Sequence, residues 1–490
     1  MKKITLSLIA ASLFSGNLLA DEAALQAQIQ KLIQRIEQLE QAQGTTQQTQ
    51  IVLQENQAEI KETQISQGDM LSKVNAQSAN DNIKWDIDLR SAFHNINYQY
   101  ADDAKNRDGS ADATHSGQKY SNNSLFTNRL WLGMGSKVND DLFFNGQVAA
   151  DYYWGADTSV NHSAMSQDMG WEANSKPHDA SLGLRQAYFV YKFGNDWDIP
   201  MTFSVGRRAA VDGFLANNRE GTQKPGSPLA HITNVEVDGA MMQFNLDKVF
   251  LPGSYLKVVY GRSYDTINQN ALSTVPYTGT TFPGDDKVDF LVLPMSIYND
   301  GASNLMAEYA MIMNAKGDTV SGTTYGGVAA GTAHYAALSY QLDGLNEDVD
   351  FLNDSTVFAS VAMTSTNPDS GYTMLGSTDN KTGYSFWAGV LFPDTISDGG
   401  RIGIEYNHGS KYWTPMTWAE DSIIGSKVAT RGDAYETYWN LPIVGKNLTA
   451  QLRYTYINYN YRSSISFMDD PSFKNLDHSQ ELRAFVRYQY

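Results

Sequence analysis

The chain has 490 residues, contains no cysteine and carries a formal net charge of −18 at pH 7. The lack of cysteine excludes disulfide bonds and thiolate metal sites, and the acidic balance argues against nucleic acid as a partner. Aromatic residues make up 12% of the chain, which also holds 39 glycines. Soluble secreted β proteins and outer-membrane barrels, whose lumen-facing half is polar, share such a composition.

Residues 1–20, MKKITLSLIAASLFSGNLLA, have the parts of a signal peptide. Lys2 and Lys3 precede an apolar stretch, and the small residue Ala20 marks the predicted cleavage site. We therefore expect the chain to be exported. No run of eighteen apolar residues follows this segment, so the sequence predicts no transmembrane helix.

In residues 21–81 the apolar residues recur at the spacing of an α-helix. Apolar residues spaced alternately by four and three form a heptad seam, with Ile at a and Leu at d: Leu25, Ile29, Leu32, Ile36 and Leu39. Such a seam is typical of a coiled coil, and the alternative is a single amphipathic helix packed on its own domain. Because the segment is rich in Gln and offers little apolar area beyond the seam, we favour a self-associating, periplasmic coiled coil.

From residue 82 to residue 490 apolar residues instead recur at every second position, as in Ile83, Trp85, Ile87 and Leu89. One alternating run is weak support for a strand, but about sixteen such runs follow, several near the length of roughly ten residues that a tilted strand needs to cross a bilayer. The connections between them alternate between long and short, as in outer-membrane barrels. The sequence therefore predicts an all-β fold, a transmembrane antiparallel β-barrel of about sixteen strands, within a range of 14–18.

The last segment, QELRAFVRYQY, alternates up to Tyr490. An unpaired sheet edge is not tolerated in hydrocarbon, so we expect this strand to pair with the first one. A terminal strand of this kind also resembles the signal that the barrel-assembly machinery recognises. Aromatic residues near strand ends are expected in the interfacial girdles; the candidates are Trp85, Trp131, Trp154, Trp387, Trp439 and Tyr490.

The third long connection, Gly206–Asn234, is unusually rich in basic residues for an acidic protein. In general porins the third extracellular loop folds into the barrel, and the glycines and prolines here permit such a bend. The alternative is an exposed surface loop. The candidates for a pore constriction are Arg207, Arg208, Asp212, Arg219, Glu220 and Lys224.

Strand parity assigns a second set of residues, all charged except Gln147, to the lumen, because charges in hydrocarbon are costly, roughly 2–4 kcal/mol for Arg or Lys at the bilayer midplane. The lumen-facing candidates are Asp86, Asp88, Arg90, Gln147, Asp151, Arg453, Arg483 and Arg487. No phosphate-binding loop, nucleophile elbow or zinc-binding helix motif is present. We therefore expect no enzyme activity, no metal and no cofactor.

Four stretches carry a family resemblance: WDIDLRSAFHNINY, NRLWLGMG, SVGRRAAVDGF and SPLAHITNVEVDGAMMQFNL. With the signal peptide and coiled coil, they resemble a domain-of-unknown-function family of porin-like outer-membrane proteins from epsilon-class proteobacteria. The layout is more loosely similar to siderophore porins. The resemblance implies a porin-like barrel and assigns neither a substrate nor binding residues.

Together these features predict a passive Gram-negative outer-membrane channel for small hydrophilic solutes, with a periplasmic N-terminus. The alternatives are a substrate-selective porin, for example for a siderophore, and a structural or adhesin barrel tethered by its coiled coil. The expected partners are outer-membrane lipid and lipopolysaccharide, the barrel-assembly machinery, and further copies of the chain as a homo-oligomer, with a trimer favoured. Peptidoglycan is a further candidate partner.

Overall fold

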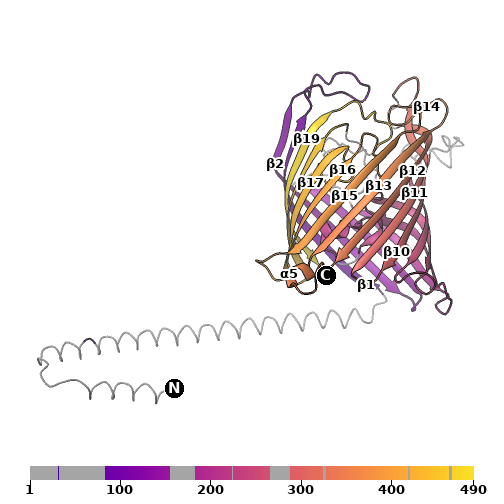
Figure 1. Cartoon of the computed structure of the whole chain (residues 1–490), viewed down its shortest axis with the longest axis vertical. Helices are drawn as coiled ribbons and strands as arrows, with labels where there is room; N and C mark the ends of the chain where they lie inside the picture. Colours follow the sequence, from indigo (N-terminus) through magenta and orange to yellow (C-terminus); the bar gives the residue numbers. More distant parts are fainter. Residues whose placement is uncertain are drawn as a thin grey trace, which may run out of the picture. The chain divides into compact units, whose positions relative to one another are not determined.

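A computed structural model describes residues 31, 83–154, 182–222, 225–264, 287–323, 327–417, 420–462 and 466–490. The chain divides into two compact units, Met1–Asp81 and Asn82–Tyr490. The predicted signal peptide and coiled coil lie outside the described residues, except for Lys31, which is helical. The second unit is the β-barrel drawn in Figure 1.

Sixteen antiparallel strands form the barrel wall, which confirms the predicted fold class and strand number. They are β1 (Ile83–Tyr100), β2 (Lys119–Lys137), β3 (Leu142–Tyr153), β4 (Gly183–Phe193), β5 (Met201–Ala210), β8 (Val235–Asn245), β9 (Tyr255–Tyr264), β10 (Val288–Asn299), β11 (Ser303–Thr319), β12 (Val328–Asp343), β13 (Thr356–Pro368), β15 (Thr382–Pro393), β16 (Arg401–Gly409), β17 (Gly432–Val444), β18 (Leu448–Tyr459) and β19 (Leu476–Gln489).

The remaining elements are short and lie in the connections. The two-residue strand β14 (Tyr372–Thr373) pairs with the end of β11, and β6 (Gly213–Phe214) pairs in parallel with β7 (Gly226–Leu229). The helices are α3 (Ala216–Glu220) and α5 (Asp350–Asn353). Among the described residues, no helix is both long and apolar enough to cross a membrane.

The first and last strands close the barrel. β1 pairs with β19 from Asp88, opposite Gln489, to Tyr100, opposite Leu476. The backbone of Tyr490 extends this ladder, because its N–H donates to the carbonyl of Ile87 and its carbonyl accepts from the N–H of Ile87. The alternation up to the last residue is therefore explained by the need to pair the final edge.

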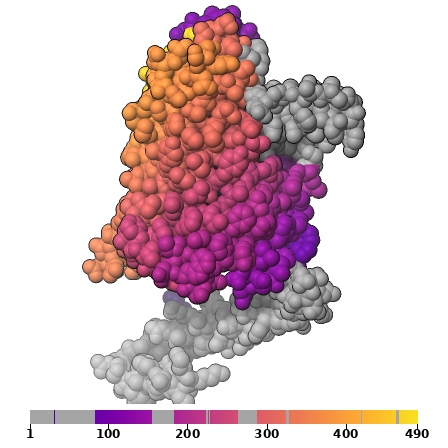
Figure 2. Space-filling model, turned by 90° about the vertical axis from the view of Figure 1, so that its right-hand side faces the viewer, coloured from indigo at the N-terminus to yellow at the C-terminus, as the bar shows by residue number. Residues whose placement is uncertain are grey.

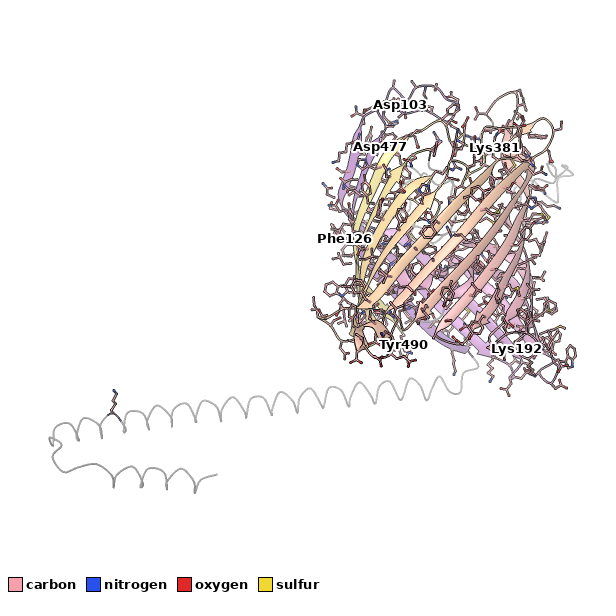
Figure 3. All side chains as sticks on the ribbon, viewed as in Figure 1. Asp103, Phe126, Lys192, Lys381, Asp477 and Tyr490 are labelled. Carbon is pink, nitrogen blue, oxygen red and sulfur yellow. The ribbon has the colours of Figure 1, made fainter. Side chains whose placement is uncertain are left out.

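Most connections at one end of the barrel are longer than those at the other, as predicted. The exception at the long end is residues 320–327, because β11 and β12 extend to Thr319 and Val328, and the exception at the short end is residues 344–355, which contain α5. The long ones span residues 101–118, 154–182, 211–234, 265–287, 320–327, 369–381, 410–431 and 460–475, and the short ones 138–141, 194–200, 246–254, 300–302, 344–355, 394–400 and 445–447. In Figure 3, Asp103, Lys381 and Asp477 mark the end with long connections, and Lys192 and Tyr490 mark the opposite end.

The outer surface of the wall is apolar and the inner surface is polar. Along β1, Trp85, Ile87 and Leu89 are exposed, whereas the alternate residues Asp88 and Arg90 are buried inside. Figure 2 shows the outer surface of part of the wall, where neighbouring strands follow chain order from magenta to orange. This separation of faces is the one that a transmembrane barrel requires.

Two tryptophans assigned to the outer girdles face inward instead. Trp131 and Trp387 are 6% and 1% exposed. Trp131 Nε1 donates to Asp151 at 3.3 Å, and Trp387 Nε1 donates to Glu405 at 2.8 Å. An inward tryptophan is stable because its N–H finds an acceptor, and alternation alone does not reveal that acceptor.

Candidate functional site in the barrel lumen

The third long connection, residues 211–234, here called loop L3, folds into the barrel. Phe214, Leu215, Leu229 and Ile232 are at most 1% exposed. Two glycines allow the parallel contact of β6 with β7: a Cβ on Gly213 would lie 2.1 Å from the carbonyl oxygen of Pro228, and one on Gly226 would lie 2.6 Å from that of Val211. Side chains at these positions would force the two halves of L3 apart.

L3 is bound to the inner face of the wall on the side of β11 to β18. The two carboxylate oxygens of Glu308 on β11 accept from the N–H of Leu229 at 2.7 Å and from Thr233 Oγ1 at 2.6 Å. His231 lies between Ser360 and Ser385, with Nδ1 2.7 Å and Nε2 2.9 Å from their hydroxyls. Burial lowers the pKa of His231 to about 3, so the ring is neutral.

A second connection, residues 410–431, here called loop L7, also folds inward, which the sequence did not predict. It runs beside L3: the N–H of Asn234 donates to the carbonyl of Met416 at 2.6 Å, and the N–H of Met416 donates to that of Ile232 at 2.9 Å. The buried Arg431 anchors L7, since its Nε donates to the carbonyl of Trp413 at 2.7 Å. The two loops thus form one internal body.

Asp421 of L7 lies among arginines from three neighbouring strands. Arg90 of β1 forms an ion pair with it, and Arg483 of β19 and Arg129 of β2 approach to 3.2 and 3.6 Å. Burial alone would raise the pKa of Asp421, but Arg483 and Arg90 lower it well below its ordinary value. The carboxylate is therefore ionised and holds L7 against this part of the wall.

Asp88 of β1 extends this cluster toward the end with short connections. Its carboxylate accepts from Arg129 Nη2 at 3.1 Å and from Arg487 Nη2 at 2.5 Å. Four arginines, from β1, β2 and β19, thus share Asp421 and Asp88. The third lumen-facing acid in this region, Asp151, is buried and accepts the N–H of Trp131.

A second group of ion pairs joins L3 and L7 to β16, β17 and β18. Arg219 of L3 lies 2.8 Å from Glu220, 2.9 Å from Glu420 of L7 and 3.9 Å from Glu436 of β17. Lys427 of L7 pairs with Glu405 at 2.5 Å and also with Glu436. Burial would raise the pKa of Glu220, but the Arg219 guanidinium lowers it to about 2.

The remaining inward charges extend the second group to β19 and β1. Arg453 of β18 lies 3.9 Å from Glu436 and 3.7 Å from Glu481 of β19. Glu481 also accepts from the ring of His94 of β1 at 2.6 Å. The second group therefore extends along the inner wall from β16 to β1, beside the first group, which spans β19, β1 and β2. Such density of buried charge is stable only because each member has a partner of opposite sign.

The structure brings most of the sequence candidates into these groups. Arg219, Glu220 and Arg453 belong to the second group, and Asp88, Arg90, Arg483 and Arg487 belong to the first, with Asp151 nearby on β3. Arg219 faces Glu420 and Glu436 and not the carboxylates of β1 and β3. Asp212 is a loop residue with a positive φ of 52°. Burial raises its pKa. Lys224 lies outside the described residues.

Three candidates stand apart from the groups. Asp86 faces inward near the end with short connections, where it packs over Gly133. Alternation along β5 puts Arg207 on the outer face with Val205, and it pairs with the exposed Asp238 at 2.9 Å. Arg208 faces inward and stacks on Tyr188 with its guanidinium 4.2 Å from the ring centroid.

Sequence reasoning missed the residues that L7 contributes. Glu420, Asp421 and Lys427 have the composition of an ordinary solvated loop, and no spacing among them indicates an inward fold. Among the described residues, no cluster of three or more His, Asp or Glu is arranged to hold a metal ion.

Two further long connections meet above the β11 side of the lumen. Arg107, in the first long connection, pairs with Asp318 at the end of β11 at 2.7 Å and with Asp469 of the last long connection at 3.5 Å. The carbonyl of Phe467 accepts from the N–H of Leu375 at 2.6 Å. These contacts span the barrel end from β1 and β19 to β11 and β13.

A family model described as "Protein of unknown function (DUF3373)" matches residues 119–485. The chain belongs to this family. No curated protein matches it. Solved structures with a similar fold include OprB of Pseudomonas putida at high pH, with 12% identity, a TM-score of 0.47, and coverage of 86% of this chain and 97% of that chain.

Two other solved structures are also similar to this chain. Salmonella typhi OmpF in complex with daunomycin has 12% identity and a TM-score of 0.44, with 84% of this chain and 99% of that chain covered. The outer membrane channel DcaP of Acinetobacter baumannii has 14% identity and a TM-score of 0.41, with 83% and 97% covered. At these identities the likeness concerns the fold alone.

Proposed function

We propose that the protein is a porin-like channel of the Gram-negative outer membrane, through which small hydrophilic solutes diffuse passively. The observation that carries this proposal is the charged inner face of a closed barrel whose outer face is apolar. Arginines and carboxylates from β1, β2, β16, β17, β18 and β19 all point inward. In transmembrane barrels such charges face a water-filled lumen, where they tune selectivity.

The constriction is formed by L3 and L7. Both loops pack against the wall from β11 to β18, and Asp421 ties L7 across to β1, β2 and β19. On the opposite side, the inward residues Tyr188, Arg208 and Lys257 keep partial exposure. We therefore place the solute path between the loop body and the wall formed by β3, β4, β5, β8 and β9. No covalent bond is made or broken during passage.

A substrate-selective porin is the second candidate function. Aromatic residues on the inner face favour it, because they provide stacking surfaces that a general diffusion pore does not need. The guanidinium groups of Arg129 and Arg185 stack on the ring of Trp131, with their Cζ atoms 3.6 and 3.7 Å from the ring centroid. Tyr188 and Tyr255 also face the lumen. A siderophore is one class of solute for such a channel.

We further propose that the barrel spans the outer membrane with the end of short connections toward the periplasm. Residues 21–81 would then form a periplasmic coiled coil of a homotrimer, supported by the heptad seam of that segment. β19 would be the strand that the barrel-assembly machinery recognises, and the long connections would meet lipopolysaccharide.

Liposome swelling tests the proposed function directly. Vesicles that contain the folded, purified full-length protein should swell in isotonic solutions of arabinose and glucose and respond progressively less to larger sugars. Vesicles prepared with the heat-unfolded protein control for leakage. Equal swelling rates of loaded and control vesicles, with folding verified by electrophoretic heat-modifiability, would contradict a diffusion channel.

A further inference from the structure

Two cations on the proposed path take no part in the ion pairs of the lumen. Arg208 lies on β5 and Lys257 on β9, and alternation puts both on the inner face, with Ser204 and Val259 respectively. Each stacks on a tyrosine: the Arg208 guanidinium on Tyr188, and Lys257 Nζ 4.9 Å from the ring centroid of Tyr255. Within the described part of the chain, neither has a carboxylate within 4 Å.

Two side-chain nitrogens of Arg208 have no hydrogen-bond acceptor among the described residues, and their arrangement suits a particular kind of ligand. Its Nε and Nη2 are buried and have no hydrogen-bond acceptor among the described residues. These two nitrogens form one edge of the guanidinium group, and their parallel N–H bonds match the two oxygens of a carboxylate or phosphate. Buried donors of a charged group are costly when unpaired. The edge is therefore suited to an oxyanion and offers nothing to a cation.

Lys257 lies on β9, two strands along the sheet from Arg208, and adds a second positive charge that repels the charge of Arg208. The carboxylate of Glu308 attracts the positive charge of Lys257 without contacting it. Both oxygens of Glu308 already accept hydrogen bonds from L3, which leaves it committed to the loop. An anion placed between the two cations would relieve their repulsion, whereas Glu308 relieves it only in part.

The wall between the two cations carries no side chains at one level. Gly206 of β5 pairs with Gly239 of β8, and Gly239 pairs with Gly261 of β9. A Cβ on Gly239 would lie 2.2 Å from the carbonyl oxygen of Tyr260, so the strands approach closely here. This glycine row leaves the inner wall bare at the level next to Arg208, and Ser204, Met241 and Val259 occupy the level between the glycine row and Lys257.

We propose that Arg208 and Lys257 form a binding subsite for an oxyanion, that is, for a solute that carries a carboxylate or a phosphate group. This inference rests on the proposed channel function and assigns it a substrate class. Arg208 would bind the oxyanion through the Nε and Nη2 edge, and Lys257 would attract it as a point charge. Tyr188 and Tyr255 hold the two cations in place through their ring faces.

Ion current through the full-length protein in planar bilayers tests the subsite. In dilute KCl at pH 7, addition of potassium succinate or of inorganic phosphate should reduce the chloride current with a saturating dose dependence. The neutral sugar glucose at the same concentration should not. Arg208→Gln and Lys257→Gln should each raise the half-blocking concentration about tenfold, since each removes a charged interaction with the anion. Arg208→Lys should fall between the parent protein and Arg208→Gln.

Arg207→Gln is the matched control, because it removes the same charge from the adjacent residue on the outer face of β5. Block by both anions shows a general oxyanion subsite, and block by one alone narrows the class to carboxylates or phosphates. A protein that conducts chloride but is blocked by neither anion, or whose block is the same in Arg208→Gln as in Arg207→Gln, overturns the subsite and leaves the channel function intact. A folded protein that conducts nothing refutes the channel function itself.

Discussion

Asp421 is the residue whose removal should most disturb the lumen. Its carboxylate pairs with Arg90 and approaches Arg483 and Arg129 to 3.2 and 3.6 Å. Asp421→Asn keeps the size of the side chain but leaves Arg129 with Asp88 alone, and leaves Arg90 and Arg483 without a paired carboxylate among the described residues. Breaking a buried ion pair by removing one partner costs about 3–5 kcal/mol, because the remaining charge stays desolvated. We expect a loss of that order in the free energy of unfolding.

The same change should alter the channel. Without the Asp421 carboxylate, L7 keeps its bonds to L3 and to β16 and β17 but loses its ion pairs with β1, β2 and β19. The arginines of those three strands then present uncompensated positive charge to the lumen. Because screening limits the reach of charge to about 8–10 Å at physiological salt, this local change should dominate over the acidic surface. Conductance should rise and the reversal potential should shift toward anions, more at low salt than at high salt.

Urea unfolding of the folded barrel in lipid, followed by tryptophan fluorescence, measures the effect on stability. Asp433→Asn is the matched control: this acid accepts from Tyr406 and from the ring of His408, but its side chain is 25% exposed, so its loss should cost less than about 1 kcal/mol. If Asp421→Asn destabilises the protein no more than Asp433→Asn does, the ion-pair cluster does not hold L7 in place.

Three other predictions concern distant parts of the chain. Burial lowers the pKa of His231 to about 3, so stability that depends on its neutral ring is present above pH 6.5 and is lost as the pH falls toward 3. At pH 4.5 the loss in the free energy of unfolding should be about 2–3 kcal/mol. His231→Gln should flatten the dependence of the unfolding free energy on pH in this range, and an unchanged dependence would contradict the burial argument. Deletion of Tyr490 should reduce the amount of heat-modifiable barrel in the outer membrane, because the ladder with Ile87 is shortened; normal levels would count against it. Ile29→Asp combined with Ile36→Asp should convert cross-linked trimers into monomers, and cross-linking that shows only monomers for the parent protein would refute the predicted trimer.

The barrel was predictable because hydrocarbon imposes a strict rule on sequence. Every strand must alternate, and every edge must pair. The pairing of β19 with β1 follows from that rule, as do the outward Trp85 and the inward Arg483. A charged residue on a transmembrane strand has one favourable face, so parity assigns it without knowledge of its partners.

The contents of the lumen follow no comparable rule. A charged loop is stable in water or against oppositely charged walls, so the sequence of L7 does not reveal that Asp421 meets Arg90. Trp131 and Trp387 were assigned to the girdles as aromatic residues near strand ends, whereas their hydrogen-bond acceptors lie inside the barrel, on β3 and β16. Arg207 and Arg208 are adjacent, and only the register of β5 separates the outward one from the inward one.

The proposed channel is tested most directly by single-channel conductance of the purified full-length protein in planar bilayers. The structure predicts a steady, ohmic current that increases when residues 216–226 of L3 are removed, because the loop body narrows the lumen. A protein shown by heat-modifiability to be folded, yet without current both before and after that deletion, would contradict the existence of a channel.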